Sequence, residues 1–284
     1  MKKITLKNIL KQMFKNFFYG LFKLKHGKIS FKENIQKQLF EEANVFFDQK
    51  NRKLEYSVYS ALNSRLYTNR IQDTAIIKNN IIIDKPSFQL RKNIFDPDIN
   101  KNIVLKIGTP YVQRNLKGTV LSLLSGGAGN NNFFHWLFDV LPRIAIAEKK
   151  FQINQINYFL CPALNKWQLE TLEILGVKKN QCLSSVDYRH IKSDKIITTS
   201  HPWVRTANII NEIENLPLWI SKWLREKFLP FKTNNKFPRK IYIDRSDSTS
   251  NLKNYRYIVN EKEVINFLKS NGFETIKLSE LNFR

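Results

Sequence analysis

Hydrophobic positions in this chain first follow a helical period and later alternate between the periods of strands and helices. Within residues 1–28, large apolar side chains recur every three or four positions, which predicts an amphipathic helix. Lysines fill much of its remaining surface, a composition typical of a helix that lies on an anionic membrane. A terminal helix that packs on the protein's own core has the same pattern, so both interpretations stay open.

Short β-rich runs, separated by turn-forming proline and glycine, occupy the region that follows the N-terminal helix. These runs are YSVYSAL, TAIIKNNIIID, NIVLKIG and GTVLSLLSG. Helices and strands then alternate, with helices expected at 131–150, 165–176 and 207–228 and strands at 156–162 and 195–201. This alternation predicts an α/β fold in which helices cover a parallel sheet.

A polar linker bounded by proline at 230–238 separates a shorter C-terminal segment. Strands are predicted at 239–246 and 273–278, with a helix at 260–271 between them. One β-loop-α-β unit cannot bury both faces of its own sheet. The segment therefore either extends the first sheet or begins a lobe that the chain does not complete.

The composition narrows the class of partner. Hydrophobic residues make up 42% of the sequence, enough for a sizeable core, and the formal net charge of +23 favours an anionic partner. The basic residues are spread along the chain, and no zinc-finger, RNA-recognition or basic-zipper pattern occurs, which argues against nucleic acid. Salt-dependent binding to duplex DNA would test that rival interpretation.

Two cysteines, Cys161 and Cys182, lack a CxxC spacing and indicate neither a metal site nor a disulfide framework. No stretch of about 20 apolar residues is present, and the basic N-terminus has no signal-peptide pattern. We therefore expect a cytoplasmic protein.

The first candidate site is the segment GGAGNNNFFHWLFDVLPR at residues 126–143. His135 and Asp139 are four positions apart on the predicted helix and share one face. A carboxylate beside an imidazole fixes its tautomer and raises its basicity, as a general base requires. Asn131 and Asn132 are candidates to bond sugar hydroxyls. A structural pair that caps a helix has the same spacing, so this alternative stays open.

Trp136, on the same predicted helix, offers an apolar plate for a sugar ring. Its alternative is an ordinary position in the hydrophobic core. The preceding glycine-rich loop is not a Walker motif, because no GK[ST] follows it.

The second candidate site is IYIDRSDSTSNLKNYRYIVNE at residues 241–261. Arg245 ends a strand, where open α/β sheets hold ligands, and Arg256 lies in the polar loop beyond it. Two such arginines can clamp a diphosphate bidentately. Asn260 is expected to be the N-cap of the next helix. The negative charge of Glu261 in its first turn suits the positive end of the helix dipole. A solvated basic loop with ordinary capping is the alternative.

Weaker candidates lie nearby. Asp244 and Asp247 form a DxxD that resembles a metal-binding DxD only loosely, so we expect no metal site. His201, in the sequence His201-Pro202-Trp203, follows a strand end and is a candidate to line the cleft, although a lone histidine there is usually structural.

Together and in this order, the two candidate sites resemble glycosyltransferase family 61. The family's N-x-F-H-W-x-x-D-x-L-P-R segment is matched by Asn132, Phe134, His135, Trp136, Asp139, Leu141, Pro142 and Arg143. Its I-Y-I-x-R, R-x-I-x-N-E and G-F-E segments are matched by Ile241, Tyr242, Ile243, Arg245, Arg256, Ile258, Asn260, Glu261, Gly272, Phe273 and Glu274. The resemblance covers roughly residues 100–284.

The resemblance implies a GT-B-like α/β fold of two Rossmann-like lobes and an inverting transfer from a nucleotide sugar to a glycan acceptor, without a metal or cofactor. It also implies a role in surface or capsular polysaccharide synthesis, and we expect the enzyme to act at the inner membrane face. His135 or Asp139 would deprotonate the acceptor hydroxyl, while Arg245 and Arg256 would stabilise the departing diphosphate. Arg143 joins the substrate-binding candidates through the motif.

The expected domains are an N-terminal region at 1–95, an acceptor lobe at 96–232 and a donor lobe at 236–284. Family members continue with a segment like H-G-A-G-x-x-N after the G-F-E strand, and this chain ends before it. We therefore expect an incomplete donor lobe. The alternative function is a non-catalytic fragment that binds a glycan or a partner.

Overall fold

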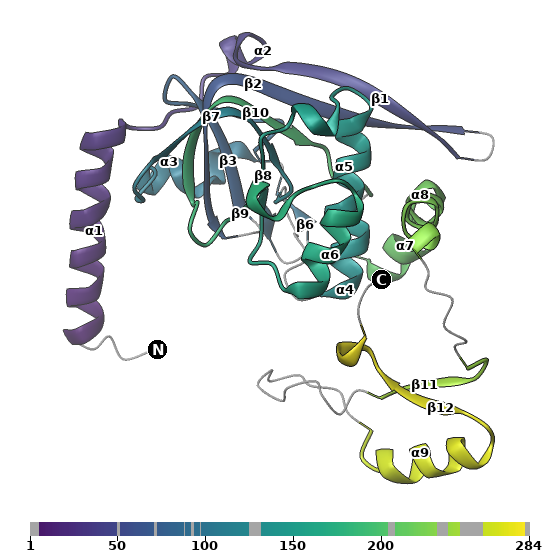
Figure 1. The fold of residues 1–284 in the computed structure, drawn as a ribbon. Coiled ribbons are helices and arrows are strands. Elements are labelled where there is room, and N and C mark those ends of the chain that lie inside the picture. The colour runs from purple at the N-terminus through teal and green to yellow at the C-terminus, as the bar shows by residue number, and fades with distance from the viewer. Residues whose placement is uncertain are drawn as a thin grey trace. The chain divides into compact units, whose positions relative to one another are not determined.

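The computed structural model describes residues 6–49, 52–70, 73–87, 89–91, 94–96, 98–124, 132–203, 208–231, 238–244 and 258–281. The chain forms two compact units, Met1–Lys227 and Phe228–Arg284. Each unit has its own sheet (Figure 1).

An eight-stranded mixed sheet organises the first unit, with the order β4-β3-β2-β10-β7-β8-β9 and with β1 paired to β2. The strands are β1 (Glu41–Gln49), β2 (Arg52–Arg70), β3 (Asp73–Lys78), β4 (Ile81–Ile83), β7 (Arg114–Ser122), β8 (Tyr158–Cys161), β9 (Cys182–Ser184) and β10 (His190–Thr199). Pairing is parallel from β10 through β7 and β8 to β9. It is antiparallel among β1, β2, β3, β4 and β10. The predicted parallel sheet is therefore one half of a mixed sheet.

The helices of this unit are α1 (Leu6–His26), α2 (Gln36–Leu39), α3 (Ile103–Ile107), α4 (Phe133–His135), α5 (Leu141–Glu148), α6 (Lys166–Ile174), α7 (Ile209–Glu214) and α8 (Leu218–Phe228). A π-helical turn, η3 (Trp136–Val140), joins α4 to α5. The two-residue strands β5 (Leu90–Arg91) and β6 (Ile94–Phe95) pair only with each other. α4, α5 and α6 lie on one side of the sheet (Figure 1), where α5 packs against β10 and β2.

Two predicted elements differ from the structure. The run NIVLKIG forms the helix α3 and not a strand, because the Asn102 side chain accepts a bond from the Val104 N–H at 3.2 Å and starts a helical turn. Gly108, with φ of 70°, ends that turn. The long helix expected at 207–228 is interrupted between Glu214 and Leu218, and Pro217 directly precedes the separate helix α8.

The large sheet contains strands from both sides of residue 95, where the sequence suggested a boundary between two domains. β2 lies before this position and pairs along most of its length with β10, which lies after it. β3 and β4 continue the same sheet from β2. Residues 52–83 are thus part of the same sheet as residues 114–199.

The second unit has the predicted order of strand, helix and strand. β11 (Ile241–Asp244) pairs in parallel with β12 (Glu274–Lys277), and α9 (Glu261–Ser270) connects them. Gly272, with φ of 79°, follows the C-terminus of α9 and lets the chain turn into β12.

In the described part of the chain, no helix has both the length and the apolar character that crossing a membrane requires. Cys161 and Cys182 are free thiols on the neighbouring strands β8 and β9.

Candidate functional site

The helix that carries His135 and Asp139 continues through Pro142 by widening for one turn. It begins after Asn132, whose side-chain oxygen accepts a hydrogen bond from the His135 N–H at 3.2 Å. Pro142 has no N–H, and its ring crowds the carbonyl four residues earlier. The π-helical turn η3 ends at Val140, two residues before Pro142, and relieves this crowding, since the Trp136 carbonyl accepts a hydrogen bond from the Leu141 N–H five positions on.

Asp139 is the centre of a polar cluster in the interior, which we call the Asp139 cluster and which also contains His135, His201 and Trp203. The Asp139 carboxylate is fully buried. Its Oδ2 lies 2.9 Å from Nδ1 of His135, and its Oδ1 accepts a 2.7 Å hydrogen bond from Nε1 of Trp203. Nε2 of His201 lies 3.7 Å from Oδ2, a distance at which the contact is electrostatic.

The surroundings keep Asp139 ionised. Burial alone would raise the pKa of Asp139, but the interactions with His135 and His201 outweigh it and hold this pKa below its ordinary value. Burial lowers the pKa of His201, whose Nδ1 contacts the Trp203 carbonyl at 2.7 Å. The cluster therefore combines a buried carboxylate with a buried neutral imidazole.

His135 is placed to accept a proton from a bound molecule. Because Asp139 is ionised and accepts hydrogen bonds only, Nδ1 of His135 carries the hydrogen and Nε2 keeps its lone pair. Nε2 has no partner among the described residues, and 34% of the His135 side chain is exposed. A carboxylate-oriented imidazole with a free, accessible nitrogen has the geometry of a general base.

Arg143 holds the helix against the end of β10. Its Nε donates to the Asp139 carbonyl at 2.7 Å, and its Nη1 donates to the Thr199 carbonyl at 3.4 Å. Burial lowers the pKa of Arg143 to about 9, so that it stays charged at neutral pH. Thr199 ends β10, so His201 and Trp203 follow the carboxyl end of a parallel strand, where α/β sheets place their ligands.

The predicted substrate-binding residues of the first site occupy different environments. Trp136 is fully buried, and its Nε1 donates to Thr171 Oγ1 at 2.9 Å. Arg143 is fully buried as well. Both side chains therefore pack beneath the site and hold its helix in place. Asn132 is exposed and caps α4, whereas Asn131 lies outside the described residues.

The second predicted site is described only in part. Arg245 and Arg256 lie outside the described residues. Asn260 holds the N-cap position of α9, but its Nδ2 donates to Glu263 Oε2 at 3.1 Å and its side chain caps no backbone N–H. Glu261 accepts a 2.9 Å hydrogen bond from the Tyr242 hydroxyl.

Asp244, half of the sequence's DxxD, lies 3.9 Å from Lys277. Across the residues that the structure describes, no group of three or more His, Cys, Asp or Glu side chains is arranged to hold a metal ion.

Sequence reasoning undervalued two members of the Asp139 cluster. His201 and Trp203 were visible only as polar and aromatic residues after a strand end, about 60 positions from Asp139. Their contact follows from the parallel pairing of β10 with β7, because α4 comes after β7 in the chain. The local spacing of His135 and Asp139, in contrast, already placed that pair on one face.

Comparison with known proteins gives one family. The family model described as Glycosyltransferase 61 matches residues 133–284, more than half of the chain, and this range begins at the helix that carries His135. No curated protein and no solved structure matches the chain significantly.

Proposed function

The chain belongs to glycosyltransferase family 61, and we propose that it transfers a sugar from a nucleotide-sugar donor to a glycan acceptor. Membership in the family implies glycosyltransferase activity. The observation that carries the more detailed proposal is the 2.9 Å contact between the exposed His135 ring and the buried Asp139 carboxylate.

In the proposed reaction, Nε2 of His135 takes the proton of an acceptor hydroxyl. The acceptor oxygen then attacks the anomeric carbon from the face opposite the leaving group. The bond to the donor diphosphate breaks, and the nucleoside diphosphate leaves with the electron pair, which inverts the anomeric configuration. The carboxylate of Asp139 stabilises the imidazolium that forms, as in other carboxylate–imidazole pairs.

Each member of the Asp139 cluster has a distinct proposed role. Asp139 has no exposed surface, so it acts as a positioning residue and His135 makes the contact with the acceptor. Trp203 satisfies the second carboxylate oxygen and fixes the plane of Asp139. Phe133 is 51% exposed two residues before His135 and offers an apolar surface to a sugar ring, a role that fully buried Trp136 is less suited to fill.

We assign recognition of the donor to the second unit on sequence grounds. Arg245 and Arg256 would clamp the diphosphate and neutralise the charge that develops on it, so the reaction needs no metal. In the first unit, Asn131 and Asn132 would donate and accept hydrogen bonds with sugar hydroxyls. In the second unit, Asn260 and Glu261 would contact the substrate at the start of α9. Two such units would correspond to the acceptor and donor lobes of a GT-B-like enzyme.

We place this reaction in the synthesis of a surface polysaccharide such as a capsule, on the cytoplasmic side of the membrane. A non-catalytic glycan-binding protein is the alternative. The Asp139 cluster favours the enzyme, because a buried carboxylate that orients an accessible imidazole is the arrangement that proton transfer by a general base uses.

Calorimetry of the full chain with a panel of nucleotide sugars tests the proposal. At least one donor should bind, and Arg256→Ala should weaken its binding about tenfold or more, since hydrogen bonds to charged groups are worth about 1.5–3 kcal/mol. Arg225→Ala, an exposed arginine on α8, is the matched control and should bind the donor normally. Equal affinities for wild type and Arg256→Ala would remove the diphosphate role, and binding of no donor would contradict the proposed function.

A further inference from the structure

α1 extends away from the sheet of its unit (Figure 1). One broad face of this helix is apolar and exposed. Eight large apolar side chains on this helix are between 44% and 86% exposed. They are Ile9, Leu10, Met13, Phe14, Phe17, Phe18, Leu21 and Leu24. Contiguous exposed apolar surface of this kind marks an interaction site in a folded protein.

A different face of α1 contacts the body of the unit. Lys23 Nζ donates to the Lys106 carbonyl at 2.7 Å, and the His26 ring lies 4.8 Å from the His190 ring in an edge-on arrangement. At 100° per residue, Met13, Phe17 and Leu24 point to nearly the opposite side of the helix from His26. Most of the apolar face is therefore turned away from the core, and only its edge, with Phe14 and Phe18, borders the pocket that Pro110 and Tyr111 also line.

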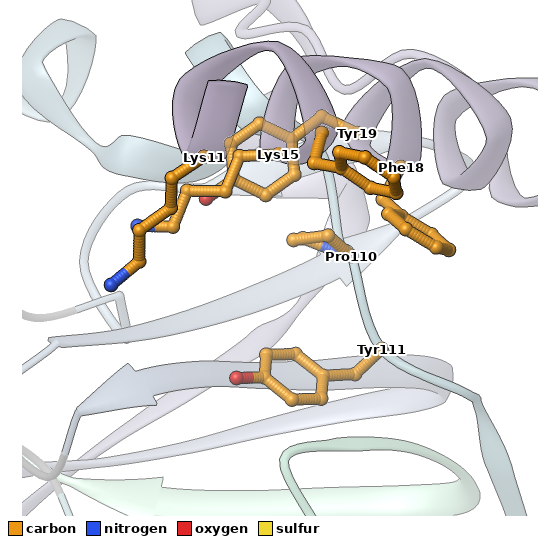
Figure 2. Close-up of a pocket in the computed structure, with 7 residues that line it drawn as sticks. Lys11, Lys15, Phe18, Tyr19, Pro110 and Tyr111 are labelled. Carbon is orange, nitrogen blue, oxygen red and sulfur yellow. The ribbon is translucent and has the colours of Figure 1, made fainter. Parts of the chain in front are cut away.

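The charge of α1 is entirely positive. Its 21 residues include five lysines and no aspartate or glutamate. Lys11, Lys15 and Lys25 fall along one border of the apolar arc when the sequence is wound as a helix. Figure 2 shows Lys11 and Lys15 extending together on one side of α1, above a pocket of about 320 Å³ that Pro110 and Tyr111 also line.

We propose that α1 docks on the surface of an anionic lipid bilayer. The helix would lie in the plane of the interface, with its phenylalanines and leucines among the acyl chains and its lysines on the lipid phosphates. A symmetric second copy fits this face less well, because pairing two α1 helices would bring two rows of lysine together. This inference is independent of the proposed glycosyl transfer.

Co-sedimentation of the full chain with vesicles tests the docking. Binding is expected to vesicles of phosphatidylcholine with 30% phosphatidylglycerol and to be at least tenfold weaker with phosphatidylcholine alone. These compositions are chosen so that only headgroup charge differs, and raising the salt concentration should weaken binding to the anionic vesicles.

Variants separate the electrostatic and apolar contributions. Lys11→Gln/Lys15→Gln should weaken binding to the anionic vesicles about 30-fold, because each lysine near such a surface contributes about fivefold. Phe17→Ala should weaken it about tenfold through lost apolar burial. The matched control, Lys53→Gln/Lys179→Gln, removes the same charge from exposed positions on other elements and should bind as wild type.

Three outcomes would overturn the proposal. One is equal binding to neutral and anionic vesicles, and another is an equal loss of binding in the control and the α1 variants. The third is dimerisation without lipid, measured by light scattering, that Phe17→Ala abolishes. Thermal unfolding checks that every variant is folded, as expected for side chains this exposed.

Discussion

Two histidine clusters of the first unit differ in the charge at their centre. The Asp139 cluster surrounds a carboxylate. The second, which we call the Arg65 cluster, lies near the C-terminus of α1 and consists of Arg65, His26 and His190. Arg65 is only 8% exposed, and its guanidinium donates to the His26 carbonyl at 3.2 Å and to Asn80.

The central charge decides what the neighbouring imidazoles can do. Burial lowers the pKa of His190 to about 4, and the Arg65 charge acts in the same direction. Its Nδ1 bonds the Tyr111 carbonyl at 3.1 Å, and its buried Nε2 meets no partner in the described chain. Asp139, in contrast, is an anion 2.9 Å from the partly exposed His135 ring and can balance the positive charge that this ring gains when it takes up a proton. Only the Asp139 cluster therefore suits proton transfer, and the Arg65 cluster is structural.

The largest expected effect is on catalysis. His135→Ala and Asp139→Asn should each lower kcat for transfer by roughly 10²–10⁴-fold, the usual contribution of a positioned general base. The KM for the donor should change little, because neither residue is assigned to donor binding. Steady-state kinetics with a donor found by calorimetry measures both constants.

His190→Asn is the matched control for this comparison. It preserves the hydrogen-bond donor to the Tyr111 carbonyl and should leave kcat within about twofold, since the Arg65 cluster takes no part in the proposed reaction. If His135→Ala kept most of the wild-type kcat, or if His190→Asn lost as much, the functional distinction between the clusters would be wrong.

The next largest effect is on stability. Arg143→Met should lower the free energy of unfolding by roughly 3–5 kcal/mol, because it leaves Asp139 as a buried charge whose nearby cation is gone. Urea unfolding followed by tryptophan fluorescence measures this difference. Arg225→Met, at an exposed position on α8, should change it by less than about 0.5 kcal/mol. Equal losses in the two variants would mean that the Asp139 cluster needs no buried cation.

The smallest effect is on the pH dependence of stability. Since the pKa of His190 is about 4 when folded and 6.5 when unfolded, the unfolded chain binds more protons in that interval. The free energy of unfolding should therefore fall as the pH drops from 6.5 towards 4, by at most about 3 kcal/mol. His190→Asn should reduce this slope, and the remainder comes from His26 and His201, whose pKa values burial also lowers.

Asp139 affects the free energy of unfolding only at a lower pH than His190 does. Its pKa is depressed below the ordinary 3.8, so its contribution is present above pH 3.8 and is lost only below it. Urea unfolding at a series of pH values resolves the two windows. An unchanged slope between pH 6.5 and 4 in His190→Asn would show that another group is responsible.

Local patterns in the sequence predicted much of the chain around the site. The helix at 133–148, the strand β8 and the helix α6 follow from apolar periodicity and capping residues, as do β11, α9 and β12. The pair His135 and Asp139 followed from its four-residue spacing. These features depend on interactions between residues that are close in the sequence, so the sequence pattern alone can predict them.

Features that depend on distant pairing were not predictable in this way. The pairing of β2 with β10 joins residues more than 120 positions apart and turns half of the sheet antiparallel. The burial of Trp136 depends on packing near Thr171 and Trp167, although its sequence neighbours suit an exposed plate equally well. His201 and Trp203 reach Asp139 only because two parallel strands bring their loops together.

The widened turn η3 has a consequence for how the protein tolerates change in length. A π-helical turn holds about one residue more than an α-helical turn, so deleting one residue between Trp136 and Val140 would restore regular winding. The helix on either side would keep its orientation, because the deleted residue is the extra one that the wide turn holds. If Leu137 were lost, His135 and Asp139 would be three positions apart and would still share one face of an ordinary α-helix. A deletion inside the regular helix α5 would instead turn everything before it by about 100°, so we expect this turn to tolerate the loss of a residue better than α5 does.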